Sequence, residues 1–340
     1  MQKSNRFLYV CLFTILILWL IVFPLFQKEF LEQFYYMPFL GVIAATVANT
    51  TPAAAGIVYF PVLTRLDITP ATAVQFSLII QAYGMGLGTF KWYHVNKKLF
   101  IANVIPLCLF GGILGIITSI VIVPIKNPEL LTLIFNAIGF IFTQIIFFSI
   151  LRKRHYPNLT IHLTPLNSII LFTCSLIGGL ISGWIGFGID TLFYFILTFL
   201  FRINPAVAIV TSISLMAALS AVGTLLNVVY FTVPLSLWYS AVPGVTLAGL
   251  FLASYFAVKI GAKNILLLFA FLMSADFFMA LWTQNTIPMS QTIRMLLTYV
   301  LVTYLLIIHV KIFKLSYQDI DTENASFKEV ESVPPTKKVA

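Results

Sequence analysis

The sequence predicts an all-α polytopic membrane protein, and three observations support this fold class. Hydrophobic residues make up 60% of the 340 residues and charged residues only 9%, whereas soluble domains carry roughly 25% charged residues. Apolar runs of about 20 residues, the length needed to cross a bilayer, recur along the chain. The Lys and Arg residues that give the net charge of +9 lie between these runs, where they orient a membrane protein, so we expect no nucleic-acid partner.

Eight apolar segments are long enough for full transmembrane helices. In chain order they are residues 7–26, 70–90, 99–123, 130–151, 205–232, 236–258, 264–283 and 291–310. The first run exceeds the roughly 7–15 residues of a signal-peptide core, so we expect an uncleaved helix. Two further apolar stretches, 38–64 and 168–200, are interrupted near the middle. From Tyr317 the chain is polar and mixed in charge, which predicts a disordered tail.

The basic residues select one topology. With a cytoplasmic N-terminus, and with each interrupted stretch entering and leaving on one side, 13 of the 20 Lys and Arg lie in the cytoplasm, 4 lie outside and 3 lie in a cytoplasmic tail. This bias agrees with the positive-inside rule. It predicts two re-entrant helical hairpins that enter from opposite faces, each followed by three spans, which is the inverted repeat of many secondary transporters.

The predicted organisation has five parts in a cell (inner) membrane, with both termini in the cytoplasm. They are an N-terminal transmembrane helix (1–34), a first repeat (35–151), a second repeat (152–283), a C-terminal transmembrane helix (284–316) and the tail (317–340). The letters support the repeat at an offset of 135, where five identities pair Ile68 with Ile203, Pro70 with Pro205, Ala71 with Ala206, Ala73 with Ala208 and Ser77 with Ser212. Upstream, Pro52–Gly56 aligns with Gly186–Asp190 at an offset of 134.

These segments resemble the sulfite exporter TauE/SafE family, whose members carry in each half a glycine-rich segment, then a proline, then a helix starting near Pro-x-x-Ala. In this chain Pro52–Gly56 is followed by Pro61 in the first half, and the second half carries Gly186–Asp190. The likeness covers roughly residues 35–283. Alanines replace glycines in the first half, and Asp190 takes the last glycine position of the second. The resemblance implies a permease for sulfite, sulfonates or related organosulfur anions.

The interruption in the first hairpin is a candidate substrate site. Asn49, Thr50 and Thr51 precede Pro52, which lacks an amide hydrogen and disturbs the helix. Backbone groups freed at membrane depth must line a cavity or be buried in protein, and a half-helix N-terminus attracts anions. The alternative is that these side chains only cap a half-helix.

Small and polar residues around both hairpins extend this candidate site. Gly56, Gly186 and Gly188 permit close backbone approach, or they serve helix packing alone. Four polar residues on the helices after the hairpins complete the predicted substrate-binding set, although hydroxyls in membrane helices often bond their own i−4 carbonyl: Ser77, Gln81, Thr211 and Ser212.

Asp190 and Asp276 are the two acidic residues within apolar segments. An intramembrane carboxylate is costly and suggests function, so we expect either to bind and release a proton during transport, Asp190 above all because it lies beside the predicted site. The alternative is a structural, hydrogen-bonded acid.

The sequence favours a secondary transporter for a small anion in the lipid bilayer. No cofactor or metal site is expected, because no His, Cys and acid cluster has metal-ligand spacing, and no nucleophile motif or P-loop predicts an enzyme. A passive anion channel is the alternative, and the oligomeric state is left open.

Overall fold

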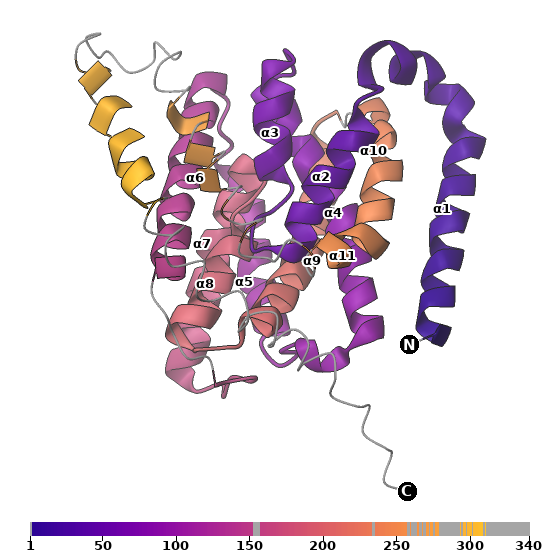
Figure 1. The fold of residues 1–340 in the computed structure, drawn as a ribbon. Helices are drawn as coiled ribbons and strands as arrows, with labels where there is room; N and C mark the ends of the chain where they lie inside the picture. Colours follow the sequence, from indigo (N-terminus) through magenta and orange to yellow (C-terminus); the bar gives the residue numbers. More distant parts are fainter. Residues whose placement is uncertain are drawn as a thin grey trace, which may run out of the picture.

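The computed structural model describes residues 2–151, 157–232 and 235–256, together with isolated positions between 259 and 310. Within these residues the chain is nearly all helical, and the secondary structure other than helix is a single parallel β-bridge between Asn158 and Ile203. Figure 1 shows the helices packed side by side as an elongated bundle, with α1 along one edge and α6 toward the other.

The first half consists of an outer helix, an interrupted helix pair and three further helices. Its elements in chain order are α1 (Gln2–Glu29), η1 (Phe30–Phe34), α2 (Met37–Thr50), α3 (Gly56–Arg65), α4 (Pro70–Val95), η2 (Lys97–Leu99), α5 (Ile105–Ile117), η3 (Thr118–Ile122) and α6 (Pro128–Leu151). The elements η1 and η3 are single π-helical turns that continue the helices before them, and η2 is a short 3-10 helix.

The second half follows the same order. Its elements are α7 (Pro165–Ile185), α8 (Ile189–Phe195), η4 (Ile196–Leu200), α9 (Pro205–Tyr230), α10 (Leu235–Leu247), η5 (Ala248–Leu252) and α11 (Ala253–Phe256). A long helix, a break, a short helix and a 26-residue helix thus occur in both halves. The π-helical turn after α5 also has its equivalent, because η5 follows α10.

Six helical segments are long and apolar enough to cross a membrane, which confirms a polytopic membrane protein. They are Arg6–Phe34, Ile105–Ile122, Pro128–Phe148, Pro165–Ile185, Pro205–Tyr230 and Leu235–Leu252. Helix α4 also has the length to cross, but Gln75, Gln81 and its glycines make it less apolar than these six. The predicted spans 264–283 and 291–310, and the tail, lie largely or wholly outside the described residues.

The capping residues explain where the two 26-residue helices begin. Thr69 accepts a hydrogen bond from the Thr72 amide ahead of Pro70, and Asn204 accepts one from the Ala206 amide ahead of Pro205. Proline suits the first helical position because its missing N–H would be unpaired there. Both caps stand at the same repeat position, 135 residues apart.

The backbone before each of these helices is also alike. Asp67 and Arg202 are the non-glycine residues with positive φ among those described, at 60° and 51°. They too are 135 residues apart. Residues other than glycine rarely adopt this left-handed backbone conformation. Its recurrence 135 residues apart is a structural similarity between the two halves that the amino-acid sequence did not reveal.

The two ends of the second interrupted stretch lie next to each other. The Asn204 amide donates to the Asn158 carbonyl at 2.9 Å, and the Asn158 side chain donates to the Phe201 carbonyl at 2.8 Å. The segment before α7 therefore lies against the segment after η4, as a hairpin requires. Its arms are unequal, however: α7 has 21 residues and could cross a bilayer alone, which the sequence did not lead us to expect.

Close glycine contacts fix how the helices pack. A Cβ on Gly115 would overlap the Leu176 carbonyl oxygen, and one on Gly179 would overlap the Gly112 carbonyl oxygen. Helices α5 and α7 consequently touch backbone to backbone along their length. On the other side of the bundle, a Cβ on Gly244 of α10 would overlap the Pro38 carbonyl at the start of α2.

Candidate functional site

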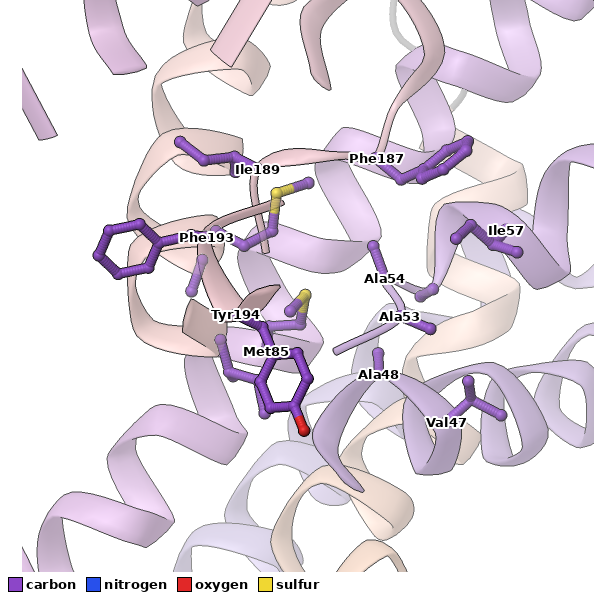
Figure 2. Packing of buried hydrophobic residues seen from close by; sticks show 14 of the residues in the cluster. Val47, Ala48, Ala53, Ala54, Ile57, Met85, Phe187, Ile189, Phe193 and Tyr194 are labelled. Carbon is purple, nitrogen blue, oxygen red and sulfur yellow. The ribbon is translucent and has the colours of Figure 1, made fainter. Parts of the chain in front are cut away.

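The two helix breaks meet in the buried centre of the molecule. The first break, between α2 and α3, contains Thr51–Ala55, and the second, between α7 and α8, contains Gly186–Gly188. Figure 2 shows Ala53 and Ala54 of the first break between the end of α2 and the segment that carries Phe187 of the second. All three of these side chains are buried.

Local chemistry produces each break. Thr51 adopts an extended conformation, as expected for a residue ahead of proline, and Pro52 has no amide to continue the α2 ladder. Helix α7 ends instead at Gly186 in the left-handed conformation, with φ of 77°, and Gly188 has φ of 142°. Glycine adopts both values without steric cost.

Reciprocal hydrogen bonds join the two breaks. Gln81 of α4, in the first half, donates from Nε2 to the Gly186 carbonyl of the second half at 2.7 Å. Thr191 of α8, in the second half, donates from Oγ1 to the Pro52 carbonyl of the first half at 2.6 Å. Pro52 and Gly186 align at the offset of 134, and each half supplies a donor for the break in the other half.

Small side chains allow this approach. A Cβ on Gly56 would lie 2.7 Å from the Gly186 carbonyl oxygen and 3.0 Å from Gln81 Nε2. A Cβ on Gly186 would lie 2.9 Å from Ser77 Cβ. Three of the predicted residues, Gly56, Ser77 and Gly186, are therefore in mutual contact, and Gly188 packs against Ile181 of α7.

A narrow crevice lies beside the first break. The empty space between its atoms totals about 180 Å³, part of which is open to the surroundings, and no part is wide enough for a water-sized sphere in this conformation. Its walls come from α2, the start of α3, α4 and α10, and consist of Ala45, Ala48, Asn49, Ala55, Tyr59, Ile80, Gln81, Gly84, Met85 and Val245. Three of these residues, Asn49, Tyr59 and Gln81, are polar.

Each polar residue of the crevice keeps one side-chain atom without a hydrogen-bond partner among the described residues. These atoms are Asn49 Oδ1, the Tyr59 hydroxyl and Gln81 Oε1, and the exposed fractions of the three residues are 2%, 0% and 0%. A buried polar group without a partner costs about 1–3 kcal/mol. Such groups gathered at one crevice mark it as a place where a ligand would supply the missing bonds.

Of the three polar residues of the crevice, Asn49 is the least available to bind a ligand. Its Nδ2 donates to the Ala45 carbonyl at 2.8 Å and more weakly to the Gly84 carbonyl at 3.4 Å. Its Oδ1 is so close to Gly88 that a Cβ there would overlap it. Asn49 therefore holds α2 against α4, and its contribution to the crevice is positional.

The hydroxyls predicted to contact substrate bond their own helices instead. Thr50, Thr51, Ser77 and Thr211 each donate to the carbonyl four residues earlier, and Ser212 donates to the carbonyl three residues earlier. Thr211 also accepts from the Ile101 amide. This is the local bonding that the sequence left as the alternative for the hydroxyls of the later helices. Of the two predicted side chains with an open acceptor in the crevice, Asn49 lies against Gly88, which leaves Gln81.

Asp190 is fully buried in the first turn of α8. Its Oδ1 accepts long hydrogen bonds from the Gly188 amide at 3.4 Å and the Thr191 hydroxyl at 3.5 Å, and its Oδ2 has no partner among the described residues. Asp276 is in a different setting, because it forms an ion pair with Arg65 at the end of α3. The two acids predicted to carry protons thus occupy separate places.

Sequence reasoning missed Tyr59 and Thr191. Tyr59 is one helical turn after Ala55, and its ring packs edge-on against Phe76 with centroids 4.8 Å apart. A tyrosine among phenylalanines in an apolar helix is a signal, because a buried hydroxyl needs a partner. Nothing in the letters links Thr191 to Pro52, which is 139 positions earlier. Among the described residues, no group of three His, Cys, Asp or Glu is placed to hold a metal ion.

Comparison with known proteins gives one match. The sequence model of the sulfite exporter TauE/SafE family matches residues 37–282. These residues include both breaks, the crevice and Asp190. No curated protein and no solved structure matches the chain significantly.

Proposed function

The chain belongs to the sulfite exporter TauE/SafE family, and we propose that it is a secondary transporter that carries a small sulfur oxyanion across the cell (inner) membrane. The observation that carries the proposal is the meeting of two interrupted helix pairs, with a crevice beside the first break whose polar groups lack partners among the described residues. Broken helices at mid-membrane form the substrate sites of many secondary transporters.

The transporter is built as an inverted repeat in this proposal. The recurrence of element order, caps and left-handed residues at one offset supports a repeat. The hydrogen bonds from Thr191 to the Pro52 carbonyl and from Gln81 to the Gly186 carbonyl, each from one half to the break of the other, support a close pairing of the breaks. With both termini cytoplasmic, the α2–α3 hairpin enters from outside and the α7–α8 hairpin from inside, so that a substrate between them is reached from either face as the halves rock.

The outer helices fit contact with lipid. Large apolar side chains on α1 are widely exposed, among them Ile21 at 67% and Leu25 at 77%. Exposed apolar surface on this scale is unfavourable in water. The bilayer is therefore the partner of these faces.

The substrate site is the crevice at the first break. The amides of Ala54, Ala55 and Gly56 precede the first helical bonds of α3 and donate none of the hydrogen bonds found among the described residues. Free amides and the helix dipole favour an anion at such an N-terminus. The Tyr59 hydroxyl adds a second kind of donor on the same helix.

Proton coupling is assigned to Asp190 rather than Asp276. Asp190 is buried with an unpartnered oxygen beside the breaks, whereas Asp276 has Arg65 as its partner. A charged carboxylate beside the site would repel an anion, and a neutral one would not. Binding of a proton at Asp190 would therefore favour entry of the anion, which couples the two.

Flux of radiolabelled sulfite into proteoliposomes tests the transporter. Saturable uptake that an imposed pH gradient stimulates, together with counterflow, is the expected result. Conductance far above carrier rates without counterflow would instead identify a passive anion channel. No flux above empty liposomes for sulfite or organosulfonates would refute the proposal.

Substitution of Asp190 tests the coupling. Asp190→Asn should lose gradient-driven uptake and keep sulfite exchange, because the amide fills the same space without binding a proton. Asp276→Asn is the matched control and should keep driven uptake. Driven uptake that is unchanged in Asp190→Asn would remove this residue from the coupling step.

A further inference from the structure

The amide of Gln81 has a fixed orientation in the crevice. Its Nε2 donates to the Gly186 carbonyl at 2.7 Å. Rotation of the amide by half a turn would place Oε1 against that carbonyl oxygen, and two acceptors repel each other. Oε1 is therefore held as the free atom, and it is an acceptor only.

Asn49 Oδ1 is also an acceptor, but it lies against Gly88 of α4. The other polar groups beside the crevice, the Tyr59 hydroxyl and the Ala55 amide, can donate. A tyrosine hydroxyl both donates and accepts, and backbone amides donate only. These groups suit any oxyanion, whatever its protonation state, because every oxyanion offers lone pairs. Gln81 Oε1 differs, because it is satisfied only by a ligand that brings a hydrogen atom to donate.

This difference separates two kinds of sulfur oxyanion. A sulfonate is fully deprotonated and offers acceptors alone, so its binding would bury Gln81 Oε1 against lone pairs or leave it unpaired. Hydrogensulfite has the same charge and keeps one acidic proton. A site that hydrogen-bonds a group on its ligand rejects analogues that lack the group, because its own buried atom is then left without a partner.

We infer that the crevice selects an oxyanion that still carries one acidic proton, and that Gln81 Oε1 accepts the hydrogen bond from that proton. The inference rests on the proposed transport function and adds the chemical form of the substrate to it. The crevice is too narrow for a water-sized sphere in this conformation, so its walls must separate for the anion to enter.

Competition in proteoliposomes tests the inference. Uptake of radiolabelled sulfite is measured at a mildly acidic pH, where hydrogensulfite predominates, against unlabelled sulfite or methanesulfonate. For the wild-type protein, methanesulfonate should compete about tenfold or more weakly, which corresponds to one buried acceptor left unpaired. Equal competition by the two anions would overturn the inference while leaving transport itself established.

Three variants separate the role of Gln81 from that of its neighbours. Gln81→Met introduces the residue found 135 positions later, Met216. It should weaken competition by sulfite but not by methanesulfonate, so that the tenfold difference between the two anions disappears. Tyr59→Phe removes a donor that serves both anions and should weaken both equally. Thr191→Val breaks the other bond between the breaks and should also affect both equally, which controls for loosening of the breaks.

Each outcome decides the question. If Gln81→Met weakens both anions equally, as Thr191→Val does, Gln81 only positions the break and the inference is wrong. If Gln81→Met cannot be purified in folded form, the wild-type preference alone decides. Absence of any flux in the wild-type protein would remove the proposed function, and this inference with it.

Discussion

Gly56, the first residue of α3, packs against the second break, and its substitution by alanine tests the geometry of the site. The added methyl group would lie 2.7 Å from the Gly186 carbonyl oxygen, 3.0 Å from Gln81 Nε2 and 3.2 Å from Ser77 Cβ. The nearest of these atoms belongs to the backbone, so it cannot rotate away. Overpacking of this kind costs about 1–3 kcal/mol.

Thermal unfolding in detergent and sulfite flux together measure the effect. A loss of about 1–3 kcal/mol should lower the unfolding temperature by a few degrees. Sulfite flux should be largely lost although the unfolding temperature falls by only a few degrees, because the methyl group separates the breaks and displaces Gln81. The matched control is Gly86→Ala on α4, where a Cβ meets nothing within 4 Å; it should leave flux unchanged and stability unchanged or slightly higher. If Gly56→Ala behaves like Gly86→Ala in both assays, the breaks do not meet as described.

Two further predictions concern packing outside the site. Gly115→Ala would drive a methyl group into the Leu176 carbonyl, so α5 and α7 must separate, and the yield of monodisperse protein should fall well below that of Gly86→Ala; an equal yield would contradict the backbone contact. The Arg65–Asp276 pair has side chains 50% and 13% exposed, so a double-mutant cycle with alanine should give a coupling below about 1 kcal/mol in thermal unfolding; a coupling of several kcal/mol would show a pair far better shielded from solvent.

The sequence was sufficient to predict the two breaks, because these depend on backbone chemistry. Pro52 removes a donor and Gly186 adopts a left-handed conformation, and such effects are local to the residue. The caps at Thr69 and Asn204 are equally local. The sequence marks the end of α7 at Gly186, but we did not predict that α7 alone is long enough to cross a bilayer, because the second stretch was interpreted as one re-entrant hairpin.

The bonds of the candidate site depend on tertiary contacts, so the sequence could propose some residues for it, without Tyr59 and Thr191, but not the bonds that each residue makes. A serine or threonine in a helix can bond its own carbonyl or a ligand, and the letters at Ser77, Thr211 and Ser212 do not distinguish these uses. The role of Gln81 depends on the hydrogen bond from its Nε2 to the Gly186 carbonyl, which fixes the orientation of its amide. Tyr59 entered the site because α3 folds back beside α4, which no local pattern specifies.

In the proposed transporter the two halves would use a similar scaffold for different chemistry, and positions 56 and 190 illustrate this. They are repeat-equivalent at the offset of 134, yet one is glycine and the other aspartate. A side chain at position 56 would collide with the Gly186 carbonyl, whereas Asp190 has room to keep one carboxylate oxygen unpartnered. The lack of a side chain at Gly56 keeps the first break free of built-in negative charge, so that break can receive an anion. The second break carries its own acid, which suits it to a proton. Divergence at one equivalent position is therefore enough to place the anion in one half of the proposed transporter and the coupling proton in the other.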